Sequence, residues 1–106
     1  MSSAESYLHV EVESRGEVVV VRAAGEVDAA TAPQLAAALE DGDAARAAVE
    51  LDLGGVTFID SSGIRVLARV HAAAVDAGRP FAITAAGEPV RKIFAMTGLD
   101  ALLTGG

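Results

Sequence analysis

One stretch in the middle of the chain decides the fold class: VELDLGGVTFIDSSGI, residues 49–64. Its first five residues alternate between apolar and acidic side chains, a period of two that is typical of a half-exposed β-strand. We expect this strand to end just before Gly54-Gly55, and residues 56–59 to form a connection. The Asp-Ser-Ser-Gly sequence at 60–63 then predicts a helix start, because short oxygen-bearing side chains accept hydrogen bonds from the free N–H groups there.

The residues that follow predict the same order of elements again. Side chains at helical spacing predict a helix that ends at Gly78: Ile64, Leu67, His71 and Val75. Residues 81–84 predict a short strand, and Glu88-Pro89 opens another helix, which Gly98 ends. On this last helix, apolar side chains including Phe94 and Met96 are expected to be packing residues. The order strand, helix, strand, helix predicts a parallel β–α–β crossover.

The first part of the chain predicts an antiparallel pair of strands. Residues 8–13 alternate between apolar and polar side chains, 14–17 are typical of a hairpin turn, and 18–21 are four valines. A run of β-branched residues is typical of a strand that is buried on both faces. The sequence Thr-Ala-Pro-Gln at 31–34 then predicts a capping-box helix start, with the helix stopping near Gly42.

These elements predict an α/β fold: a small mixed β-sheet of four or five strands with helices packed against it. The 106 residues, 52% of them hydrophobic, are enough for one core and leave no room for a second. We therefore expect a single domain over residues 1–106, with residues 1–6 flexible.

Composition narrows the class of function. The chain has 15 acidic against 8 basic residues, a formal charge of −7, which argues against nucleic-acid binding. It has no cysteine and only two histidines, so we expect neither a metal site nor a cofactor. The N-terminus lacks the features of a signal peptide, and no apolar run is long enough to span a membrane. A cytoplasmic protein is expected, and its oligomeric state stays open.

An enzymatic function is not expected from these residues. Ser61 lacks the Gly-x-Ser-x-Gly pattern of a hydrolase nucleophile. His71 lies ten residues further along the same predicted helix, which places it about 15 Å away along the axis at a rise of about 1.5 Å per residue. No glycine pattern of a phosphate or dinucleotide loop is present.

The candidate site is the start of the helix at Ser61. A helix N-terminus has about half a positive charge and unpaired N–H donors, so hydroxyls at Ser61 and Ser62 could accommodate a phosphate. Asp28 and Asp60 each follow a predicted strand and are expected to approach each other. Gly63 is expected to let the backbone of a partner come close. The alternative is that these side chains merely cap the helix.

Three segments together resemble the STAS family, most of all stand-alone bacterial anti-sigma factor antagonists. The segments are Gly-Glu-Val-Asp at 25–28, Phe-Ile-Asp-Ser-Ser-Gly-Ile at 58–64 and Val-Arg-Lys-Ile-Phe-Ala-Met-Thr-Gly-Leu at 90–99. The resemblance spans residues 10–103. It implies that Ser61 accepts phosphate from an anti-sigma factor serine kinase, and that a serine phosphatase removes it. The unmodified protein would bind the kinase and release the sigma factor.

The resemblance also implies roles for the neighbours of Ser61. Asp28 would contact the kinase, and Ser62 would tune the loop. Arg65 stands where many family members have a second glycine, and it could pair with the phosphate or with an acidic partner, or simply be solvated. Two other functions stay open: a non-switching STAS subunit of a lipid-transport or stress-signalling complex, and a small nucleotide-binding or hydrolytic enzyme.

Overall fold

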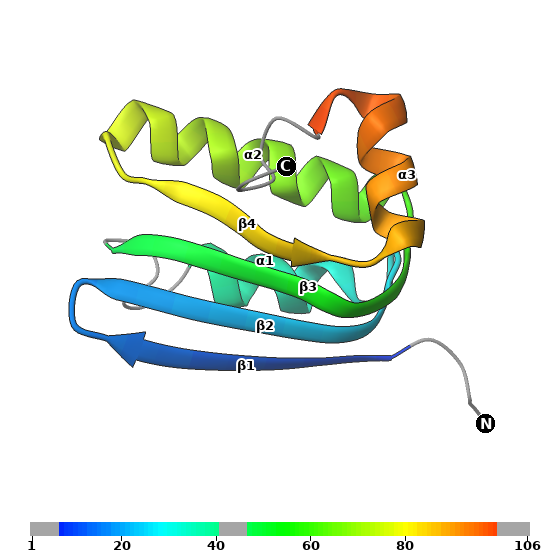
Figure 1. The fold of residues 1–106 in the computed structure, drawn as a ribbon, viewed down its shortest axis with the longest axis horizontal. Coiled ribbons are helices and arrows are strands. Elements are labelled where there is room, and N and C mark those ends of the chain that lie inside the picture. The colour runs from blue at the N-terminus through cyan, green and yellow to red at the C-terminus, as the bar shows by residue number, and fades with distance from the viewer. Residues whose placement is uncertain (1–6, 41–46, 100–106) are drawn as a thin grey trace.

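The computed structural model describes residues 7–40 and 47–99, and the predicted flexible segment 1–6 lies outside them. Its four strands are β1 (Leu8–Arg15), β2 (Val18–Val27), β3 (Ala48–Ile59) and β4 (Phe81–Ala86). They form one sheet in the order β1-β2-β3-β4. β1 pairs with β2 antiparallel, and the other two pairings are parallel. The predicted α/β fold with a small mixed sheet is thereby confirmed (Figure 1).

The described helices are α1 (Ala32–Glu40), α2 (Ser61–Ala77) and α3 (Glu88–Thr97). α1 and α2 pack against each other, and they contact β1, β2 and β3 between them. Because both lie on crossovers that advance in the same direction through the sheet, they cover the same face. α3 packs against β3, and Figure 1 shows it at the end of the sheet where β3 finishes.

The core lies between the sheet and these helices. The largest fully buried side chains come from β2, β3, β4 and the three described helices. The valine run of β2 is largely buried, as predicted, whereas only Leu8 is buried in β1. On α3 the prediction was right for Phe94, which is fully buried, but wrong for Met96, which is 80% exposed. Val75 on α2 is also exposed, so the buried stripe of that helix differs from the predicted one.

One predicted strand boundary was wrong. β3 does not stop before Gly54-Gly55 but runs on to Ile59, so the expected connection is itself strand. The pairing of β2 with β3 is irregular here, with register shifts between Arg22 and Ala24 and again after Gly25. A Cβ on Gly55 would lie 2.8 Å from the Cβ of Ala24. The glycine therefore belongs to a bulged part of the strand rather than to its end.

The start of α1 also differs from the prediction. The side chain of Gln34 does not return to the backbone of Thr31 as in a capping box, because its Nε2 donates to the carbonyl oxygen of Leu8 at 2.9 Å. Gln34 thus ties α1 to β1. The predicted helix stop near Gly42 lies outside the described residues, whereas α2 does end at Gly78, in the left-handed region at φ 70°.

Candidate functional site

The carboxyl ends of β2 and β3 meet at one edge of the sheet. Val27 and Ile59 are register partners at these ends, and the backbone N–H of Asp60 donates to the carbonyl oxygen of Val27 at 3.1 Å. Asp28 and Asp60 are therefore adjacent in space although 32 positions apart in sequence. The predicted approach of Asp28 and Asp60 is confirmed for the backbone at these strand ends. Parallel strands end at a common edge, and that edge is where α2 begins.

Ser61 is the first residue of α2 and is exposed. Its hydroxyl has no hydrogen-bond partner among residues 7–40 and 47–99. A hydroxyl in this position can enter the active site of a visiting enzyme without any unfolding of the domain. Ser61 is therefore accessible for the predicted modification.

Asp60 is the N-cap of α2, with extended backbone at φ −112° and ψ −169°. Its Oδ1 accepts hydrogen bonds from the backbone N–H groups of Ser62, at 2.8 Å, and Gly63, at 3.4 Å. We expected the N–H groups at this helix end to be available to a phosphate. That expectation needs correction, since the Asp60 carboxylate already occupies two of them.

Asp28 shapes the loop between β2 and α1. Its Oδ1 accepts hydrogen bonds from the backbone N–H groups of Ala30 and Thr31, both at 3.0 Å. In return the Thr31 Oγ1 accepts from the backbone N–H of Asp28 at 2.9 Å. Thr31 is the buried polar side chain of the described part of the chain. Asp28 and Thr31 therefore fix the loop beside Ser61, in addition to any contact with a partner.

Gly63 has a different role from the one expected. It is buried, and a Cβ at this position would lie 2.6 Å from Cγ1 of Val27 and 2.7 Å from Cγ1 of Ile59. The missing side chain lets the first turn of α2 pack on the ends of β2 and β3. The predicted contact of Gly63 with the backbone of a partner is thus corrected: its close approach is to this domain's own core.

Ser62 and Arg65 lie on the side of α2 that faces α1. Ser62 is half-buried and Arg65 is exposed, and both line a groove between the two helices with a volume of about 480 Å³. This groove was not predicted from the sequence. The signal that could have indicated it is the run of small residues on α1, including Ala32, Ala36 and Ala37, because small side chains leave space between packed helices.

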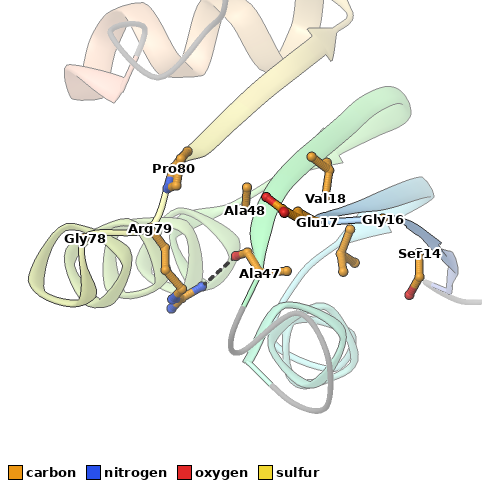
Figure 2. Close-up of a pocket in the computed structure, with 10 residues that line it drawn as sticks. Ser14, Gly16, Glu17, Val18, Ala47, Ala48, Gly78, Arg79 and Pro80 are labelled. Atoms are coloured by element: carbon orange, nitrogen blue, oxygen red, sulfur yellow. Dashed lines mark hydrogen bonds between the residues drawn. The ribbon is translucent and has the colours of Figure 1, made fainter.

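A larger cavity, of about 700 Å³, lies at the other end of the strands, where β2 and β3 begin. Figure 2 shows its lining from the β1–β2 turn, the start of β3 and the segment after α2, where Nη1 of Arg79 donates to the carbonyl oxygen of Ala47 at 3.3 Å. None of the predicted site residues lines it. It therefore lies apart from Ser61.

The described residues contain no group of three or more His, Cys, Asp or Glu side chains that could hold a metal ion. No helix in the described ranges is both long and apolar enough to cross a membrane. His71 is half-buried and its ring lies 6.5 Å from the ring of Phe81, centroid to centroid, so it packs against β4 instead of serving Ser61.

A four-stranded mixed sheet with helices packed against it, and with an exposed serine at the start of α2, resembles a STAS domain. A family model described as "Mlab, STAS domain" matches residues 10–104, and the chain belongs to this family. No match was found among curated proteins.

The chain is also similar to solved structures of anti-sigma factor antagonists. An anti-sigma factor antagonist from Mycobacterium paratuberculosis is 30% identical, with a TM-score of 0.77 over 92% of this chain and 84% of that one. The anti-sigma factor antagonist SpoIIAA in its unphosphorylated form is 23% identical, with a TM-score of 0.75 over 91% and 86%. The phosphorylated Bacillus SpoIIAA is 21% identical, with a TM-score of 0.72 over 91% and 89%. The last two likenesses show the fold.

Proposed function

We propose that this chain is a cytoplasmic anti-sigma factor antagonist that is switched by phosphorylation of Ser61. In the unphosphorylated form it binds an anti-sigma factor serine kinase, which then releases its sigma factor. Phosphorylation by that kinase ends the binding, and a serine phosphatase restores it. The domain itself acts by binding its partner rather than by catalysis. The observation that supports this most is the exposed hydroxyl of Ser61 at the first position of α2, without a hydrogen bond among the described residues.

Electrostatics supports a switch at this position. A phosphate adds about −1.5 to −2 charges at neutral pH. It would be added at the strand ends that Asp28 and Asp60 follow, on a chain whose formal charge is already −7. Because Asp60 occupies two of the nearby N–H groups, the added charge would be poorly compensated by the helix end. A change of about 2.8 kcal/mol at the interface lowers affinity about 100-fold.

A local charge change is sufficient without a change of fold. SpoIIAA in its unphosphorylated and phosphorylated forms matches this chain with TM-scores of 0.75 and 0.72. The same fold is therefore compatible with both states of that protein. In this chain Asp28, Asp60 and Ser62 would contact the kinase around Ser61, on loops that their own hydrogen bonds hold in place.

The direct test is phosphorylation by the anti-sigma factor kinase of the same cell. Incubation with this kinase and ATP should add one phosphate, and mass spectrometry should locate it on Ser61. Ser61→Ala should remain unmodified, and Ser14→Ala, an exposed serine at the distant end of β1, is the matched control that should be modified like the wild type. Full modification of Ser61→Ala would contradict the assignment. A pull-down with unmodified protein should retain the kinase.

A second candidate is a non-switching STAS subunit of a larger assembly. It is favoured by the capping of α2, in which Asp60 uses N–H groups that a phosphate would otherwise bind. In that case Ser61 would be only the first helical residue. Co-purification with the other subunits would then be the same for the wild type, Ser61→Ala and Ser61→Asp.

A further inference from the structure

The groove between α1 and α2 begins beside the candidate site. Ala29, which follows Asp28, and Ser62, which follows Ser61, both line its near end. Its floor is apolar, with Ala32, Ala36 and Val66 almost fully buried. A partner that docks around Ser61 therefore meets this groove as a direct continuation of the same surface.

The charge of the groove is opposite to that of the whole chain. Among the described residues that line it, two are arginines, Arg65 and Arg69, and one is an acid, Glu40. The Glu40 carboxylate accepts hydrogen bonds from Nε and Nη2 of Arg69, at 2.8 and 3.3 Å, which leaves the charge of Arg65 uncompensated within the groove. A local positive charge on a chain of net charge −7 is a specific feature of this surface.

Arg65 differs from Arg15 and Arg22 in its hydrogen bonds. Arg15 and Arg22 each hydrogen-bond to Glu13. The guanidinium of Arg65 has no hydrogen bond or ion pair within residues 7–40 and 47–99, and it is exposed. Its donors are available to a carboxylate from another molecule, and a guanidinium can bind a carboxylate through two parallel N–H groups.

We propose that the α1–α2 groove is a docking surface for an acidic segment of the anti-sigma factor partner, with Arg65 as its ion-pair anchor. This rests on the proposed function, and it adds the chemistry of the partner's contact. Apolar side chains of the segment lie over the alanines of the floor, and a carboxylate pairs with Arg65. Residues 61 and 65 are four apart, so they lie on the same side of α2 one turn apart. A phosphate on Ser61 therefore competes with the partner's carboxylate for Arg65.

Calorimetry with the anti-sigma factor kinase retained by the wild-type chain tests this proposal. Arg65→Glu should weaken binding about tenfold at low ionic strength, and less at high ionic strength, since exposed ion pairs are screened by salt. Arg65→Lys, which keeps the charge but loses the paired N–H groups of the guanidinium, should weaken binding less than Arg65→Glu does. Arg15→Glu makes the same charge change beside the distant β1–β2 turn, and its affinity should stay within about twofold of wild type.

Amide shifts in the NMR spectrum of labelled protein locate the contact independently. Added kinase should shift the amides of Ala29, Ala37 and Arg65. Wild-type binding with no effect of Arg65→Glu, or with shifts confined to the opposite face of the sheet, would overturn the groove proposal alone. If the amides of the groove residues shift when the concentration of this chain alone is raised, the groove binds a second copy of the chain. That result would also overturn the groove proposal. If the wild type binds no anti-sigma factor, the proposed function and the groove proposal both fail.

Discussion

The backbone N–H of Asp60 donates to the carbonyl oxygen of Val27 over 3.1 Å, and this bond joins the end of β3 to the end of β2. Each of these strand ends is followed by an aspartate that accepts hydrogen bonds from the N–H groups of the next turn. The loop of Asp28 and the first turn of α2 are thus held beside each other. Ser61 therefore lies at an edge of the sheet whose backbone is held in place by hydrogen bonds.

Asp60→Ala should destabilise the domain by about 1 kcal/mol, because the N–H groups of Ser62 and Gly63 lose the side-chain cap. Urea unfolding followed by circular dichroism measures the change. Asp60→Asn is the matched control and should lose much less, since asparagine also caps helices well. Identical unfolding midpoints for Asp60→Ala and the wild type would show that the cap does not stabilise α2.

Gly63→Ala should lower the free energy of unfolding by about 1–3 kcal/mol, the usual cost of overpacking. The added Cβ would lie within 3 Å of side-chain atoms of Val27 and Ile59, both of them buried. Chemical denaturation measures this loss. Ser62→Ala, at the neighbouring position, should change stability by no more than about 0.5 kcal/mol. A Gly63→Ala protein as stable as the wild type would disprove the packing role.

Phosphoserine at position 61 should have a lower second pKa in the wild type than in Arg65→Gln. The guanidinium one turn away favours the dianion of the phosphate over the monoanion. The second pKa of a phosphoserine free of such neighbours is about 6. Titration followed by ³¹P NMR gives both values, and any effect of Asp60 is common to the two proteins. Arg15→Gln should leave the pKa unchanged. The same pKa with and without Arg65 would exclude an interaction with the phosphate.

The pH dependence of stability should include a contribution from Glu13 on β1. Hydrogen bonds from Arg15, and next from Arg22, hold the pKa of this carboxyl below its ordinary value. Because the folded pKa is depressed, the stabilisation is present above the unfolded pKa and is lost as pH falls through the folded pKa. Glu13→Gln should therefore be slightly less stable than the wild type at neutral pH and equal to it in acid.

Urea unfolding of the wild type and Glu13→Gln, at neutral pH and again in acid, measures the difference in stability between the two proteins. The effect should be small, since the carboxylate and both arginines are exposed to solvent and salt weakens such pairs. Glu17→Gln is the control, because this exposed acid has no hydrogen bond to an arginine among the described residues. A stability difference for Glu13→Gln that persists unchanged in acid would rule out the ion pairs as its cause.

The sequence alone determined the order of the elements and the place of the candidate site. Periodicity is a local property, so the alternation at 49–53 and the helical spacing after Ser61 were sufficient to predict the second strand–helix unit. The meeting of Asp28 and Asp60 followed from a general rule, since neighbouring parallel strands end at one edge. The left-handed Gly78 and Gly98 ended their helices as predicted.

The tertiary structure decided what each of these residues contacts. Gly54-Gly55 indicated a strand end, yet pairing with the bulged part of β2 keeps the chain extended. Gln34 bonds to Leu8 instead of capping α1, and Gly63 packs on Val27 instead of meeting a partner. The groove beside Arg65 exists only because α1 and α2 pack together. Such contacts join residues far apart in the chain, and the free energy of packing them is not contained in any local pattern of side chains.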